Sequence, residues 1–164
     1  MALVGGGSNP KWPKNKVIMW DDLEVNKFEE LNHNQEVLGV KMRPECVIVA
    51  ITSRIYLYSL PEFAIIGQID SDQSNGPTIG ISQVDDNFRL ALPSPNVGKI
   101  TIKRSLDQAE PEQTIAAHEE RAVFNLALSF DGRYLATTST NGKRVKIFDV
   151  DTLQLIRTYR RGFS

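Results

Sequence analysis

The sequence has little of what metal sites, disulfide frameworks and membrane spans require. Among 164 residues there are one cysteine, Cys46, and two histidines, His33 and His118. A single cysteine excludes an internal disulfide and a multi-cysteine zinc site, and two histidines argue against a histidine-rich metal centre. The longest apolar runs, such as residues 47–51, are far shorter than the roughly 20 residues that cross a bilayer. We expect no cofactor, no metal and no transmembrane segment.

The chain also lacks an excess of charge of either sign. Nineteen Lys and Arg residues stand against twenty Asp and Glu residues, for a formal net charge of -1. Such a balance creates no overall attraction to nucleic acid or to acidic lipid, so any anion site must be local. No basic segment followed by an apolar one opens the chain, and we expect a cytoplasmic protein.

What the sequence does contain is a repeat of short β-branched and aromatic runs, separated by Gly, Pro, Asn and Asp. The aligned positions Trp20, Tyr58, Lys103 and Phe148 are 38, 45 and 45 residues apart. Four-stranded propeller blades repeat about every 40 to 45 residues. The pattern predicts an all-β, WD-repeat-like β-propeller, with a small β-sandwich as the alternative. The four runs are residues 17–21, 55–59, 100–104 and 145–149.

Further strand patterns surround these runs and complete each repeat. The strand count predicts three four-stranded units, preceded by one that lacks its first strand, or about three and three-quarter blades. A closed ring needs about four to eight blades, so we expect a part of a longer propeller. The Asn141-Gly142 pair predicts a tight hairpin with positive φ at both positions. The expected units are residues 1–34 (incomplete), 35–72, 73–117 and 118–164.

Several motifs that would suggest an enzyme lack their context. The glycines at positions 5–7 are followed by no Gly-Lys-Ser/Thr ending and no helix pattern, so we interpret them as turn residues. The acidic pairs at 21–22, 85–86 and 119–120 place adjacent carboxylates on diverging sides of a strand or turn. We therefore expect no catalytic site; the alternative of a propeller hydrolase would need carboxylates that converge at the central channel.

Four stretches, in order along nearly the whole chain, resemble the PROPPIN family, the phosphoinositide-binding β-propellers of autophagy that are also called WIPI proteins. The resemblance implies a seven-bladed fold in which the Arg-Arg-Gly hallmark lies between the fifth and sixth blades. The stretches are Leu3-Val4-Gly5-Gly6-Gly7 with Trp20-Asp21-Asp22, then residues 54–59, then Ala117-His118-Glu119, and finally residues 135–149 with Tyr159-Arg160-Arg161-Gly162.

The tandem arginines are the main candidate binding residues. A guanidinium group can make two parallel hydrogen bonds to a phosphate, and consecutive residues of an extended segment point to opposite sides. Arg160 and Arg161 should therefore serve two pockets. The resemblance implies that Arg160 faces a pocket of the fifth blade, lined by His118, Ser139, Lys143 and Lys146, and that Arg161 faces the sixth blade. A bound dianion would raise the pKa of His118.

The resemblance implies a non-enzymatic scaffold that binds phosphatidylinositol 3-phosphate or the 3,5-bisphosphate. It would lie peripherally on autophagosome-precursor, endosomal, lysosomal or vacuolar membranes. An autophagy lipid-transfer protein would be its partner, contacting the early blades. The alternative is a generic WD-repeat protein–protein interaction scaffold that does not bind lipid.

Overall fold

The computed structural model describes residues 1–107 and 109–162, which form strands and connecting turns. The strands build four antiparallel sheets, each from consecutive segments of the chain. The first sheet has three strands and the others have four, as the repeat predicts.

Sheet A contains β1 (Ala2–Val4), β2 (Lys16–Asp21) and β3 (Asn26–Asn32). Sheet B contains β4 (Gly39–Met42), β5 (Cys46–Ala50), β6 (Arg54–Ser59) and β7 (Ile65–Asp70). Sheet C contains β8 (Gly80–Ile81), β9 (Leu90–Pro93), β10 (Lys99–Lys103) and β11 (Gln113–Ala116). Sheet D contains β12 (Val123–Leu128), β13 (Tyr134–Ser139), β14 (Arg144–Asp149) and β15 (Leu155–Arg160).

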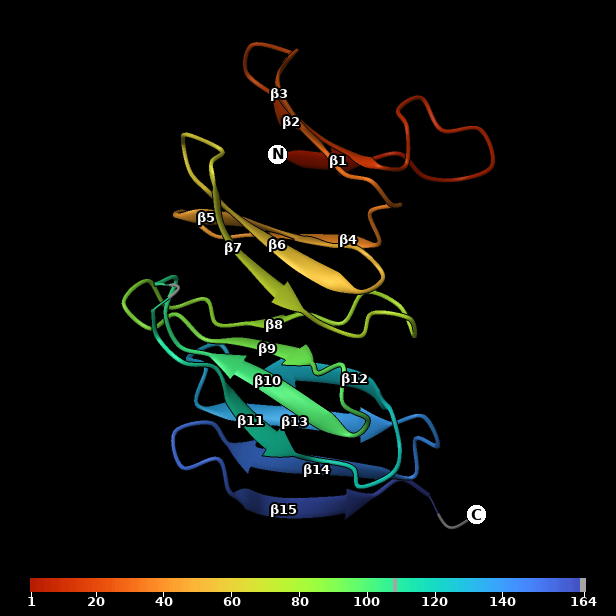
Figure 1. Cartoon of the computed structure of the whole chain (residues 1–164), viewed down its shortest axis with the longest axis vertical. Coiled ribbons are helices and arrows are strands. Elements are labelled where there is room, and N and C mark those ends of the chain that lie inside the picture. Colours follow the sequence, from red (N-terminus) through yellow and green to blue (C-terminus); the bar gives the residue numbers. More distant parts are fainter. Residues whose placement is uncertain (108, 163–164) are drawn as a thin grey trace.

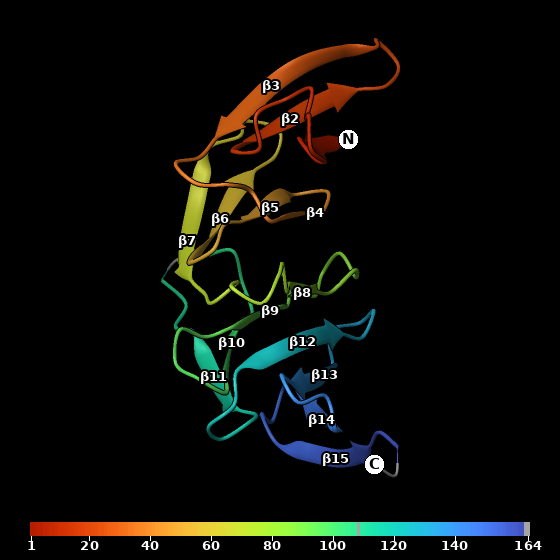
Figure 2. The ribbon, with the colours of Figure 1, turned by 90° about the vertical axis from the view of Figure 1, so that its right-hand side faces the viewer.

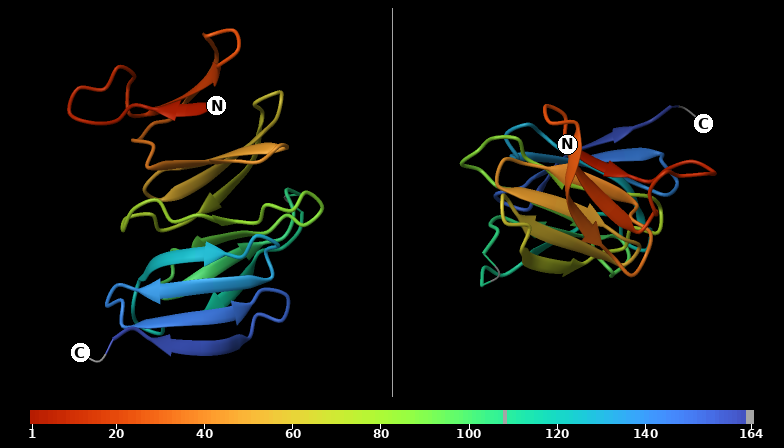
Figure 3. Two further views of the ribbon diagram at one scale, coloured as in Figure 1. Left: turned by 180° about the vertical axis from the view of Figure 1, so that it is seen from behind. Right: turned by 90° about the horizontal axis from the view of Figure 1, so that it is seen from above.

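The sheets stack face to face along the long axis of the molecule, with sheet A at one end of the stack and sheet D at the other (Figure 1). A quarter turn shows the same order of sheets (Figure 2), and the view along the axis shows them lying over one another (Figure 3). Strand β12 lies against β8 and β9, and β1 lies against β4. This arrangement is a partial β-propeller, and the predicted fold class is confirmed.

Three apolar clusters hold neighbouring sheets together, and strand alternation explains their composition. In β5, every residue is buried, with Cys46, Ile48 and Ala50 facing sheet C and Val47 and Val49 facing sheet A. A strand covered on both faces needs apolar side chains at successive positions. That requirement accounts for the continuous apolar run in the sequence. One of the other two clusters joins sheets A and B, and the other joins sheets C and D.

Arginines add polar links between the sheets. Arg43, at the β4–β5 turn, is buried and donates to the carbonyl of Ser82, and through Nη2 to those of Val84 (3.0 Å) and Asp85 (3.2 Å). Arg104 donates to the carbonyl of Val150 at 2.7 Å. Buried backbone carbonyls need partners, and a guanidinium can satisfy several at once.

The hairpin at Asn141-Gly142 forms, but not with the predicted backbone. Gly142 has a φ of 61°, whereas Asn141 is not among the residues with positive φ. The amide of Gly142 donates to the carbonyl of Ser139 at 2.8 Å, which closes a turn that places only the glycine in the left-handed region. The prediction of positive φ at both positions was wrong, because the connection between β13 and β14 is four residues long rather than two.

Candidate functional site

The end of β15, the β13–β14 hairpin and the β11–β12 connection enclose a cavity of about 430 Å³. It contains all five residues that were predicted to form the pocket of Arg160. The three segments meet at one end of the strands, on the right-hand side of Figure 1. The cavity is lined by His118, Glu119, Glu120, Arg121, Ser139, Asn141, Lys143, Arg144, Lys146 and Arg160.

Strand register explains why the cations gather in this cavity. Arg144 on β14 lies directly opposite Arg160 on β15, and Lys146 lies two residues further along the same face. Two like charges directly opposite each other in a sheet are destabilising. Neither arginine side chain has a hydrogen bond or ion pair with any residue that the structure describes. The arrangement therefore leaves two uncompensated guanidinium groups side by side.

His118 forms the inner wall of the cavity. Its side chain is buried, and Nε2 lies 2.8 Å from Oγ1 of Thr137. Burial, together with the nearby ammonium group of Lys146, lowers the pKa of His118 to about 4. At this pKa the imidazole is neutral at pH 7. The expected rise of its pKa on binding a dianion stays a prediction.

The other predicted residues differ in how freely they could meet a ligand. Lys146 Nζ donates to the carbonyl of Ala117 at 2.6 Å, which holds the ammonium group next to His118. Ser139 is buried and donates its hydroxyl to Oδ1 of Asn141 at 2.9 Å. The side chain of Lys143 is exposed and has no partner among the described residues. Lys143, Arg121, Arg144 and Arg160 are thus the free cations of the site among the described residues.

Arg144, Arg121, Asn141 and the acidic pair Glu119–Glu120 were missed as members of this site. For Arg144 the signal was present, since residues 144 and 146 are two apart and share one face of an extended strand. For the turn residues there was no comparable signal, because their approach to β15 depends on the packing of sheet D against sheet C.

Arg161 lies on the opposite side of the chain from Arg160. It lines a separate cavity of about 510 Å³ on the open face of sheet D, mostly among apolar and neutral side chains such as Phe124, Leu126 and Val145. Arg161 is the one charged residue that lines this cavity within the described part of the chain. A Cβ added at Gly142 would lie 4.0 Å from its guanidinium group.

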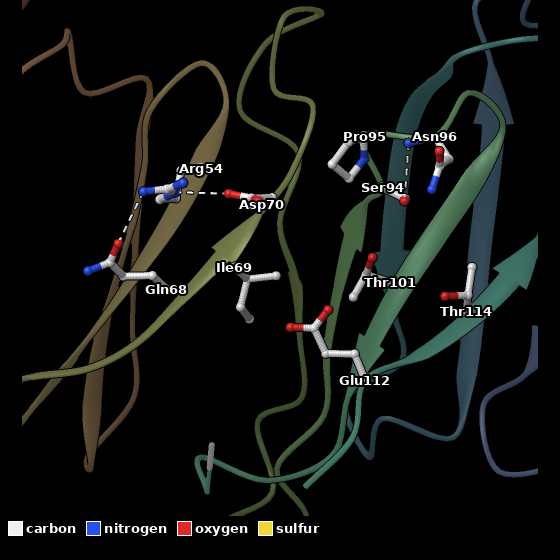
Figure 4. A pocket seen from close by; sticks show the side chains of 10 residues that line it. All are labelled: Arg54, Gln68, Ile69, Asp70, Ser94, Pro95, Asn96, Thr101, Glu112 and Thr114. Atoms are coloured by element: carbon white, nitrogen blue, oxygen red, sulfur yellow. Dashed lines mark hydrogen bonds and ion pairs between the residues drawn. The ribbon is translucent and has the colours of Figure 1, made fainter. Parts of the chain in front are cut away.

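A third cavity, of about 480 Å³, lies between sheets B and C (Figure 4). Its arginine, Arg54, donates to Asp70 at 2.9 Å and to Gln68 at 3.2 Å. Glu112 adds a second carboxylate to the lining. With its one cation already paired and a further acid present, this cavity does not favour an anion.

Comparison with known proteins places this geometry in a family. No family model matches the chain. The chain is 29% identical to SVP1-like protein 2 of Schizosaccharomyces pombe over 100% of its own length, and 30% identical to autophagy-related protein 18e of Arabidopsis thaliana over 98%. Its fold matches Kluyveromyces lactis Hsv2 with a TM-score of 0.77 at 22% identity, covering 92% of this chain and 46% of that one. It matches KlAtg21 with a TM-score of 0.80 at 19% identity, covering 99% of this chain and 54% of that one. The predicted resemblance to the PROPPIN family is confirmed.

The chain spans 45% and 42% of the lengths of these two PROPPIN relatives. Among the described residues, no helix is long and apolar enough to span a bilayer.

Proposed function

We propose that this chain is a non-enzymatic, phosphoinositide-binding scaffold that is recruited to membranes in autophagy. The observation that carries the proposal is the unneutralised pair of Arg144 and Arg160, facing each other in one cavity with Lys143 beside them. Guanidinium groups bind phosphate oxygens through parallel charge-assisted hydrogen bonds, so a phosphorylated inositol headgroup would relieve their repulsion.

The remaining walls suit the same ligand. Lys146 and His118 lie deeper, and the hydroxyl of Ser139 and the amide of Asn141 add neutral groups that can bind inositol hydroxyls. Arg161 is the one cation that lines its cavity among the described residues, so we propose a smaller contribution from this residue. The proposed lipids are phosphatidylinositol 3-phosphate and the 3,5-bisphosphate. The proposed location is cytoplasmic and peripheral on autophagosome-precursor, endosomal, lysosomal or vacuolar membranes.

Protein partners are a second part of the proposal. The Arabidopsis thaliana relative is named as autophagy-related, and KlAtg21 was solved in complex with the coiled coil of AgAtg16. We propose that an autophagy protein, such as a lipid-transfer protein, binds the first two sheets while sheet D binds the membrane. Two weak contacts on one assembly would reinforce each other.

Vesicle flotation tests the lipid proposal. Phosphatidylcholine vesicles with or without phosphatidylinositol 3-phosphate are floated with the wild type, with Arg160→Thr and with the control Arg54→Thr, which removes an arginine that is already paired. We expect the wild type and the control to float only with the phosphoinositide, and Arg160→Thr to remain in the soluble fraction. Equal recovery of all three proteins would overturn the proposal in favour of a protein-binding scaffold.

A further inference from the structure

Two carboxylates lie among the cations of the Arg160 cavity. Glu119 and Glu120 are exposed on the β11–β12 connection and line the same cavity as five lysine and arginine side chains. Within residues 1–107 and 109–162, neither glutamate takes part in a hydrogen bond or an ion pair through its side chain. By contrast, Glu30 and Asp70 each pair with a lysine or an arginine. The two carboxylates are thus unpaired and can interact electrostatically with a ligand in the cavity.

The turn that carries the two glutamates is held firmly against sheet C. The amide of Arg121 donates to the carbonyl of His118 at 3.0 Å, which puts Glu119 and Glu120 at the two central positions of the turn. The carbonyl of Gly98 accepts from the amides of Ala117 and His118, both at 2.9 Å. The approach is so close that a Cβ at position 98 would lie 2.0 Å from the carbonyl oxygen of His118. The backbone therefore cannot swing the carboxylates away from the cavity without breaking these contacts.

The net charge of the cavity determines how much negative charge on a ligand it can neutralise. Five cationic side chains and two carboxylates line it, and His118 is neutral, so the cavity carries three net positive charges. A phosphomonoester carries about 1.5 to 2 negative charges at pH 7. An inositol headgroup with one phosphomonoester and the phosphodiester of its lipid linkage therefore matches the cavity. A second phosphomonoester exceeds the available positive charge.

We propose that Glu119 and Glu120 make this cavity select a headgroup with one phosphomonoester over a headgroup with two. The selection rests on the proposed function, since it concerns the same cavity and the same class of ligand. Fixed carboxylates repel every anion, but the repulsion grows with the charge of the anion, so it penalises the more highly phosphorylated ligand more.

Calorimetric titration with soluble headgroups tests the selection. The probes are glycerophosphoinositol 3-phosphate and glycerophosphoinositol 3,5-bisphosphate, which keep the phosphodiester of the lipid, and inorganic phosphate. We expect the wild type to bind the 3-phosphate at least as tightly as the 3,5-bisphosphate, and both more tightly than inorganic phosphate. In Glu119→Gln/Glu120→Gln, affinity for the 3,5-bisphosphate should rise at least about threefold more than affinity for the 3-phosphate. This difference between the two gains in affinity should shrink at about 1 M salt, where the screening length is only about 3 Å.

A matched control separates local from overall charge. Asp85 and Asp86 are exposed on the β8–β9 connection, at the opposite end of the strands. Asp85→Asn/Asp86→Asn removes the same two charges and should leave the ratio of the two affinities unchanged. If the glutamate variant binds both headgroups with an unchanged ratio, or if the aspartate variant shifts the ratio equally, the selection is overturned while the lipid proposal stands. If the wild type binds no probe better than inorganic phosphate, the lipid proposal is overturned as well.

Discussion

Sheets B and D place an arginine at the same point of their third strand, but they surround it differently. In sheet B, Arg54 lies opposite Asp70 and forms an ion pair at 2.9 Å. In sheet D, Arg144 lies opposite Arg160, and no carboxylate that the structure describes pairs with either. The backbone pairing is the same, so the difference is one of charge alone. A position that is neutralised in one sheet is left cationic in the other.

The neighbouring hairpins of sheets C and D sharpen this contrast. Ser94 and Asn96 on the β9–β10 turn contribute to the cavity of Figure 4, and Ser139 at the end of β13 and Asn141 on the β13–β14 turn contribute to the cavity of Arg160. The two hairpins share a Ser-x-Asn sequence. The scaffold thus supplies similar neutral groups at both places, and the cations decide which cavity suits an anion.

The largest expected effect concerns an arginine that is neither free nor exposed. Arg43 donates to the buried carbonyl of Ser82 and to the part-buried carbonyls of Val84 and Asp85 on the β8–β9 connection, so Arg43→Ala should lower the free energy of unfolding by about 3 kcal/mol, because it leaves those carbonyls without partners. Urea denaturation measures the change. Arg160→Ala, which breaks no described contact, is the control and should unfold as the wild type does. Similar losses in both variants would show that the arginines of the two regions are not used differently.

The sheets were predictable because strand alternation, the repeat length and the Gly, Pro and Asn turns all depend on local sequence. The facing of Arg144 and Arg160 could also have been predicted once β14 and β15 were paired in register. The pairing of Arg54 with Asp70 follows from the same reasoning one repeat earlier. In each case, the spacing of two strands around a short hairpin decides which side chains meet.

The β11–β12 connection could not be predicted in this way. Whether Glu119 and Glu120 lie near Arg160 depends on how that connection docks on Gly98 of another hairpin. The partners of Arg43 lie about 40 residues away in sequence, on a different sheet. The neutral state of His118 likewise results from burial and from Lys146, which are both consequences of sheet packing.

The next largest effect is the contribution of His118, on the inner wall of the cavity, to the pH dependence of folding stability. Because the pKa of His118 is lowered to about 4 in the folded chain, the unfolded chain binds more protons between about pH 6.5 and 4. Stability should therefore fall as pH falls through this window, with His118 contributing up to about 3 kcal/mol. In His118→Gln this part of the loss should vanish, as measured by urea denaturation at several pH values. The remaining slope should come partly from His33, whose pKa is also lowered by burial. An unchanged slope in His118→Gln would contradict the assignment.

Converting sheet D to the charge pattern of sheet B should abolish binding without harming the fold. Arg160→Asp places a carboxylate opposite Arg144, where it can form the ion pair seen between Arg54 and Asp70. We expect affinity for phosphatidylinositol 3-phosphate vesicles to fall at least about tenfold, which corresponds to about 1.4 kcal/mol. Cosedimentation gives the affinity, and a melting temperature at or above that of the wild type confirms that the fold is intact. Retained affinity would show that the free arginine pair does not carry binding.

The reverse conversion should have the smallest effect. Asp70→Asn removes the carboxylate from Arg54, so sheet B then has an unpaired arginine in its cavity. Among the described residues, that cavity still contains Glu112 and no second cation, in contrast to the cavity of Arg160, which is lined by five cations including Arg160 itself. Asp70→Asn is combined with Arg160→Asp, so that any binding must come from Arg54. Vesicle flotation of this double variant should show no more binding than that of Arg160→Asp alone. Recovery would mean that one free arginine on this scaffold is sufficient, and that the clustering of cations in sheet D is not what distinguishes the two regions.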